Sequence, residues 1–114
     1  MVTFEEKRRF PRIRLKSPIQ WQIRGANELS RNAVTDDISL SGMSFTNDKF
    51  VAPDATLMLQ VNVLSRILYP IAKVVWSNPM PHSDRYQVGV QFLEFDPMER
   101  RYLGDYIDMQ RQVL

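Results

Sequence analysis

Apolar and polar residues alternate along several short segments of the chain, and this alternation most narrows the folds that it can adopt. At 19–23 every second residue is apolar, and Trp21 among them is assigned to the core. A period of two places one face of a strand in a core and the other in solvent, as in antiparallel sheets. In the predicted strand 86–95, Gly89 indicates a bulge or a close backbone approach. In the predicted strand 68–77, Pro70 is tolerable because it lies near the start. Six segments are predicted to be strands: 19–23, 31–38, 43–46, 57–64, 68–77 and 86–95.

The period changes near the end of the chain. Asp96 can cap a helix, and Pro97 suits the first helical position. From Met98 to Gln110 apolar residues recur at helical spacing on one stripe, which predicts an amphipathic C-terminal helix. Six strands at hairpin spacing and one terminal helix predict an antiparallel barrel or sandwich, with the helix packed on it or closing one mouth.

Positive charge is concentrated near the beginning of the chain. Residues 7–16 read KRRFPRIRLK and hold six of the 15 Lys and Arg residues, which leaves nine basic and 13 acidic residues elsewhere. A local basic patch indicates a polyanionic partner or a solvated arm, and not a general affinity for nucleic acid. The 114 residues fit one domain. We predict a flexible basic arm over 1–14 and a barrel with its helix over 15–114.

The residue types that most catalysis needs are scarce. The chain has no cysteine, and its one histidine, His82, lies in a proline-rich loop. This excludes a disulfide scaffold and a thiol nucleophile, and it leaves little material for a catalytic triad or a metal site. Asp36 and Asp37 are adjacent on a strand and would point to opposite faces, which does not suit an acid–base pair. We therefore predict no catalytic residue, no metal and no cofactor.

The chain carries no signal for a membrane. No apolar stretch is long enough for a membrane span, and the N-terminus is charged, unlike a secretory signal. The absence of cysteine fits a reducing compartment. We predict a cytoplasmic protein without membrane insertion.

The first candidate binding motif is R-x-x-x-R in the segment 8–12, which reads RRFPR and has Arg8 and Arg12 at its ends. Arginine pairs through its planar fork with phosphate or with the O6/N7 edge of guanine, and it stacks on base faces. The segment is therefore either a claw for a nucleotide or part of a solvated terminus.

The second candidate is D-x-S-x-x-G in the segment 37–42, which reads DISLSG. A carboxylate can accept hydrogen bonds from guanine N1–H and N2–H₂, a serine hydroxyl can assist, and a glycine lets the backbone approach a flat ligand. The same residues also favour an Asx or ST turn between two strands. Each motif alone leaves both interpretations open.

In this order and separated by a strand, the two motifs resemble the PilZ domain, a bacterial receptor module for cyclic di-GMP. The segment 72–76, AKVVW, looks like the family's strand ending in Val-Val-Trp, and 86–92, YQVGVQF, looks like its G-V-x-F strand. A C-terminal helix follows. The resemblance covers the chain from about Glu6 to about Tyr106. It implies a six-stranded antiparallel β-barrel with a terminal helix, which agrees with the strands predicted above.

The resemblance also assigns roles to the basic arm. Arg8 and Arg12 would grip guanine edges and phosphates of the ligand, and Arg9 would add charge or stacking. In the family that this chain resembles, the type of residue before R-x-x-x-R goes with the number of bound ligands. A cation there accompanies a stacked pair instead of a single ligand. That residue is Lys7. Its charge would relieve the repulsion between the phosphates of two ligand molecules.

In the body of the domain, Asp37, Ser39 and Gly42 would line a pocket around one guanine. Some family members stack an aromatic residue of the later strands on a base, and Trp76 is the candidate here. Trp76 is otherwise a core residue, because strand periodicity places it on the same face as Val74. Both interpretations of Trp76 stay open.

These roles imply a cyclic di-GMP receptor that is not an enzyme and that relays the signal through a conformational change to a protein partner. The alternative is a PilZ-like adaptor that binds proteins with little or no ligand dependence. A barrel that binds single-stranded nucleic acid is disfavoured, because such barrels use a charged groove, whereas this body is mildly acidic.

Overall fold

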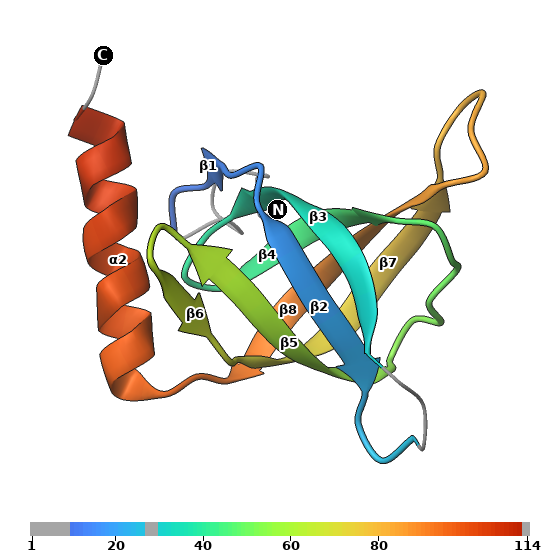
Figure 1. Ribbon diagram of the computed structural model, residues 1–114, viewed down its shortest axis with the longest axis horizontal. Helices are drawn as coiled ribbons and strands as arrows, with labels where there is room; N and C mark the ends of the chain where they lie inside the picture. Colours follow the sequence, from blue (N-terminus) through green and yellow to red (C-terminus); the bar gives the residue numbers. More distant parts are fainter. Residues whose placement is uncertain (1–9, 27–29, 113–114) are drawn as a thin grey trace, which may run out of the picture.

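The computed structural model describes residues 10–26 and 30–112, and six long strands among them form a closed antiparallel β-barrel (Figure 1). The strands are β2 (Pro18–Ile23), β3 (Arg31–Ile38), β4 (Gly42–Asn47), β5 (Thr56–Val63), β7 (Ile71–Pro79) and β8 (Tyr86–Glu94). They are hydrogen-bonded in the order β3, β2, β5, β7, β8, β4, and β4 pairs with β3 to close the ring. The predicted six-stranded barrel is confirmed.

The predicted strand 68–77 is divided in the structure. A short strand, β6 (Arg66–Leu68), pairs with β5, and β7 begins only at Ile71. Pro70 lies in the gap, where it has no amide hydrogen to donate to a ladder, while its carbonyl accepts a bond from the amide of Leu59 at 3.1 Å. Pro70 therefore separates the pairing of β6 with β5 from the pairing of β7 with β5.

Another short strand, β1 (Ile13–Arg14), attaches the chain before β2 to the barrel. Ile13 lies opposite Ile38 and Arg14 lies opposite Asp37 of β3. The arm predicted over 1–14 thus has its last two residues in β1, and its residues 1–9 lie outside the described part of the chain.

The barrel interior is filled by the apolar side of each strand. Along β5 the apolar residues Leu57, Leu59, Val61 and Val63 are buried, and the residues between them are more exposed, as the alternation predicts. Trp21 is buried as predicted, and its indole N–H donates to Oδ1 of Asn47 at 3.0 Å. The amide of Asn47 in turn donates to the carbonyl of Lys49 at 2.7 Å. The side-chain amide of Asn47 therefore satisfies the hydrogen-bonding groups of both the Trp21 indole and the loop at Lys49.

The C-terminal helix, α2 (Pro97–Gln112), lies at one end of the barrel beside β1 and β6 (Figure 1). Asp96 caps it, because its Oδ2 accepts from the amides of Met98 and Glu99 at 3.0 Å each. Leu103, Tyr106 and Ile107 form its buried face. The predicted helix is confirmed. In the part of the chain that the structure describes, no helix has the length and apolar character needed to cross a membrane.

We predict that Asn47→Ala lowers the free energy of unfolding by roughly 1–3 kcal/mol, because the buried indole N–H of Trp21 loses its acceptor. Urea denaturation monitored by tryptophan fluorescence measures this loss. Asn32→Ala, at an exposed position of β3, is the matched control and should leave stability almost unchanged. An Asn47→Ala variant as stable as the control would show that the Trp21 contact contributes little.

Candidate functional site

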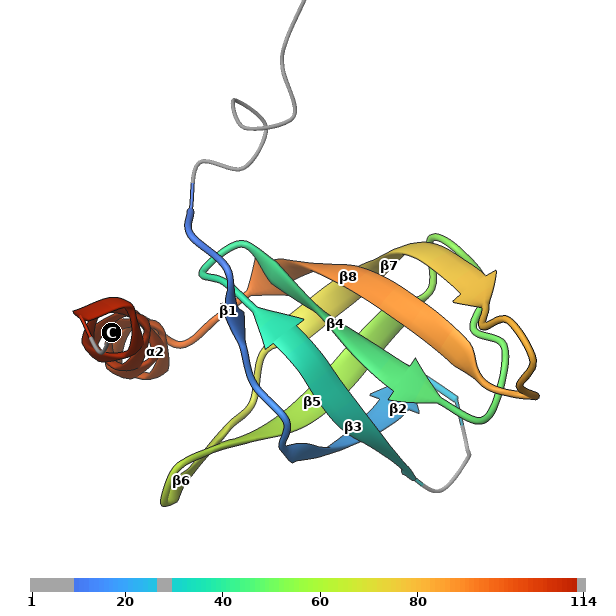
Figure 2. The same cartoon turned by 90° about the horizontal axis from the view of Figure 1, so that it is seen from above.

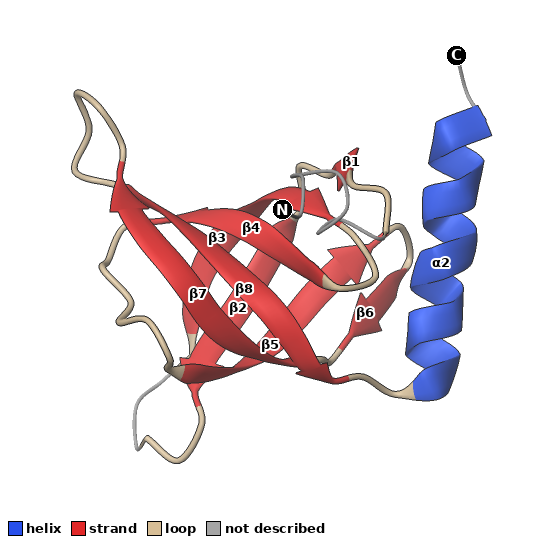
Figure 3. Cartoon of the chain, turned by 180° about the vertical axis from the view of Figure 1, so that it is seen from behind, coloured by secondary structure: helices blue, strands red, loops and turns tan. Residues whose placement is uncertain are grey.

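Strands β3, β4, β8 and β7 are neighbours in the barrel wall (Figure 3). A row of four paired residues crosses these strands. Asp37 lies opposite Ser44, Ser44 lies opposite Gly89, and Gly89 lies opposite Trp76. This cross-strand row brings the aspartate of the D-x-S-x-x-G motif and the tryptophan of the Val-Val-Trp strand onto one face, although they are far apart in the sequence.

A β-bulge turns Trp76 to the outside of the barrel. The pairing of β7 with β8 shifts between Val74 and Trp76, so Val75 is an extra residue on β7. Val74 is fully buried, whereas Val75 is 52% and Trp76 is 37% exposed. The alternation that would place Trp76 in the core with Val74 is therefore interrupted by one residue, and Trp76 is a surface residue.

The indole of Trp76 packs directly on the backbone of Gly89. A Cβ atom at Gly89 would lie 2.2 Å from Cε2 of Trp76, much closer than real Cβ atoms approach other atoms. The indole therefore lies against bare backbone, and only glycine leaves room for it. The close backbone approach that the sequence predicts at Gly89 is confirmed.

The arm reaches this wall through an ion pair. Nε and Nη2 of Arg12 donate to Oδ1 of Asp37 at 3.1 Å and 2.9 Å. The two side chains are partly exposed, at 26% and 34%. Because β1 sets Arg14 opposite Asp37, the neighbouring backbone already holds Arg12 next to this carboxylate. The structure thus brings together one residue from each of the two motifs.

The turn between β3 and β4 uses Ser39 and Gly42 for its own shape. Ser39 is fully buried, its hydroxyl accepts from the amide of Ser41 at 3.1 Å, and its amide donates to the carbonyl of Gly42 at 2.8 Å. A Cβ atom at Gly42 would lie 2.2 Å from the carbonyl oxygen of Val90, so glycine is needed for the close approach to β8. These two motif residues form the wall and the turn, and the Oγ atoms of Ser39 and Ser41 lie within hydrogen-bonding distance of each other at 3.0 Å.

A hollow of about 520 Å³ lies over this wall. Its lining residues are Arg12, Ser41, Gly42, Met43, Val75, Trp76, Gly89, Val90 and Gln91. It combines a guanidinium, an exposed indole, a hydroxyl and an amide, which can hold an anion beside a flat ring. We name it the motif hollow.

The sequence motifs identify only part of this lining. Ser41 and Gln91 were not predicted as site residues, although Gln91 has the same strand phase as Gly89 and could have been placed on the same face. Lys7, Arg8 and Arg9, which the sequence assigns to the site, lie outside the described residues.

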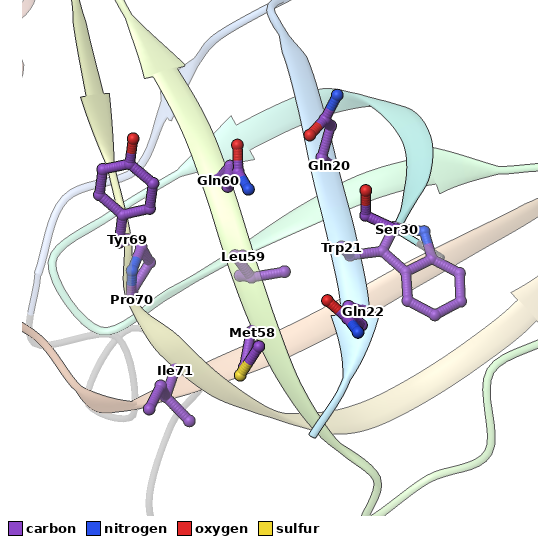
Figure 4. Close-up of a pocket in the computed structure, with 10 residues that line it drawn as sticks. All are labelled: Gln20, Trp21, Gln22, Ser30, Met58, Leu59, Gln60, Tyr69, Pro70 and Ile71. Carbon is purple, nitrogen blue, oxygen red and sulfur yellow. The ribbon is translucent and has the colours of Figure 1, made fainter. Parts of the chain in front are cut away.

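A separate hollow of about 250 Å³ lies over β2, β5 and the start of β7 (Figure 4). Gln20, Gln22 and Gln60 surround it with Met58 and Tyr69 (Figure 4). None of its lining residues is charged, so nothing there can neutralise a phosphate. The motif hollow is the better candidate for an anionic ligand.

Comparison with known proteins places the fold. A family model described as the PilZ domain matches residues 6–109. No curated protein matches the sequence closely enough to count as a relative. The PilZ domain of YcgR from Escherichia coli, solved with c-di-GMP, has a TM-score of 0.64 at 17% identity, over 93% of each chain.

Two longer proteins contain the same fold. The inhibitor of motility MotI from Bacillus subtilis has a TM-score of 0.77 at 17% identity, over 93% of this chain and 52% of that one. MrkH from K. pneumonia, solved in complex with c-di-GMP, has a TM-score of 0.66 at 21% identity, over 92% of this chain and 52% of that one. This chain spans about half the length of both proteins. The likeness in fold agrees with the family match over most of the chain, and the chain belongs to the PilZ domain family.

Proposed function

We propose that this domain is a receptor for cyclic di-GMP and binds it in the motif hollow. The observation that carries the proposal is the meeting of Arg12, Asp37 and Trp76 on one outer wall. Membership of the PilZ family supports it, as do similar structures that were solved with c-di-GMP, among them those of YcgR and MrkH.

Each group of the site suits one part of the ligand. The exposed indole of Trp76 offers a face on which a guanine can stack. The two Arg12 nitrogens that contact Asp37, Nε and Nη2, both donate to Oδ1, so the other carboxylate oxygen can accept from the guanine N1–H and N2–H₂ edge. Arg12 can pair with phosphate or guanine through its remaining donors. Gly42 lets β4 pack closely against β8 in the wall that lines the hollow, and Ser39 holds the turn.

The arginines of the arm complete the proposed site. Arg8 and Arg9 lie just before Phe10, which is the first described residue, and we assign them to the phosphates and guanine edges. The ligand would then bind the arm to the barrel wall and change the surface that the arm presents. A protein partner that recognises this surface would receive the signal without any catalysis. We place this receptor in the cytoplasm, in keeping with its cysteine-free sequence.

We predict selective binding of cyclic di-GMP over GTP and cyclic di-AMP. Asp37 suits the guanine edge, which cyclic di-AMP lacks, and the two motifs together offer hydrogen-bonding groups for a ligand with two guanines, whereas GTP has one. Isothermal titration calorimetry with the three nucleotides tests this. Equal binding of all three, or none, would contradict the receptor proposal. Absence of binding by a folded protein would favour the adaptor that acts without ligand.

We predict that Arg12→Ala and Arg8→Ala each weaken binding of cyclic di-GMP roughly 5- to 150-fold, or about 1–3 kcal/mol for a bidentate contact. Arg12→Ala should lower the stability of the free protein by at most about 1 kcal/mol, since its ion pair is partly exposed. Arg14→Ala is the matched control, because Arg14 is an exposed neighbour on β1. A similar loss of affinity in Arg14→Ala would show that only general charge matters.

We predict that two stacked ligand molecules bind per chain, because the extra cation of Lys7 would relieve the repulsion between the phosphates of the two molecules. The calorimetric stoichiometry of the wild type and of Lys7→Leu measures this. A wild type that saturates at one ligand would reject the pair. A Lys7→Leu variant that still takes two would keep the pair and exclude Lys7 as its cause.

A further inference from the structure

Arg100 places a second guanidinium near the motif hollow, and no sequence motif contains it. It lies at the start of α2, where its amide donates to the carbonyl of Asp96 at 2.8 Å. Its Cζ atom stands 5.4 Å from the centroid of the Phe10 ring. Phe10 is two residues before Arg12, so this contact joins the arm to the helix. Figure 2 shows β1 passing between α2 and the wall of β3 and β4.

Arg100 borders a hollow that adjoins the motif hollow. This adjoining hollow has a volume of about 320 Å³ and is lined by Phe10, Leu40, Ser41, Gln91, Phe92, Leu93, Phe95 and Arg100. Ser41 and Gln91 line both hollows, so the two lie side by side. Trp76 stands in one of them and Arg100 in the other, with the amide of Gln91 between them.

The guanidinium of Arg100 retains unused hydrogen-bonding capacity. Among the described residues the ion pairs are Arg12 with Asp37, Lys16 with Asp36 and Lys73 with Asp54, and Arg100 belongs to none of them. The Phe10 ring offers a π face and no carboxylate or carbonyl acceptor, so this contact leaves the N–H donors of the guanidinium available for an anion. Arg100 is therefore a cation held in place by a ring and still able to pair with an anion.

The geometry points to Arg100 as a further ligand-binding residue that contacts a phosphate of cyclic di-GMP from the α2 side. This inference rests on the proposed function of the motif hollow. Arg12, just before β1, lines one of the two hollows and Arg100 of α2 lines the other, so a ligand with two phosphates can meet a cation in each. The helix thereby becomes part of the binding site.

Titration of Arg100→Ala, Arg100→Lys and Phe10→Leu with cyclic di-GMP at several salt concentrations tests the inference. We expect Arg100→Ala to weaken binding roughly 5- to 20-fold, as the loss of one charge-assisted contact at an exposed position predicts. Arg100→Lys should recover part of the affinity, because it keeps the charge and loses the fork. Arg111→Ala is the matched control: it removes the same charge from the same helix, about 16 Å away along its axis.

The salt dependence separates a phosphate contact from a role in positioning the arm. Salt should weaken the binding of Arg100→Ala less than that of the wild type, because one screened attraction is missing. Phe10→Leu should keep the salt dependence of the wild type. Reduced affinity of Arg100→Ala with an unchanged salt dependence would overturn the phosphate contact, as would affinity equal to that of Arg111→Ala. A wild type that binds no cyclic di-GMP would instead refute the proposed function and, with it, the role of Arg100.

Discussion

The packing of the Trp76 indole on the bare backbone of Gly89 is the contact on which the outer wall depends. Without a Cβ atom at Gly89 the ring can lie flat across β8, and the bulge at Val75 turns it there. Neither the bulge at Val75 nor the glycine at position 89 would by itself place the indole on the outer wall. A bulge opposite a larger residue would push the indole away from the wall, and a glycine opposite a regular strand would leave Trp76 in the core. The aromatic face of the motif hollow is thus set by two residues on neighbouring strands.

The arm acts on this wall through its last residues. β1 adds two residues to the edge of β3 and so fixes the backbone beside Asp37. Arg12 then needs only its own side-chain torsions to reach the carboxylate. A basic residue on a long tether would lose much more conformational entropy on reaching the same place. The R-x-x-x-R motif is therefore anchored at its second arginine by the sheet itself.

The sequence predicts what depends on local periodicity and misses what depends on pairing between strands. Alternation along β5 and helical spacing in α2 identify both elements, and Gly89 indicates its own close approach. The orientation of Trp76 depends on the register between β7 and β8, which its own strand does not encode. The contact of Arg100 with Phe10 joins opposite ends of the chain and has no local signature. Such contacts can be identified only in the folded structure, where the arm and α2 lie close together.

The weakness of the Arg12–Asp37 pair suits a binding site better than a strong pair would. Two partly exposed partners gain little from their attraction, about 0–1 kcal/mol, because water screens them. Under the proposed function, a ligand can therefore compete with this pair for Asp37 and Arg12 with little loss of stability. A fully buried pair would resist this exchange, since breaking it leaves an uncompensated charge. The partly exposed ion pair thus holds the side chains of Arg12 and Asp37 in position and leaves them able to exchange partners.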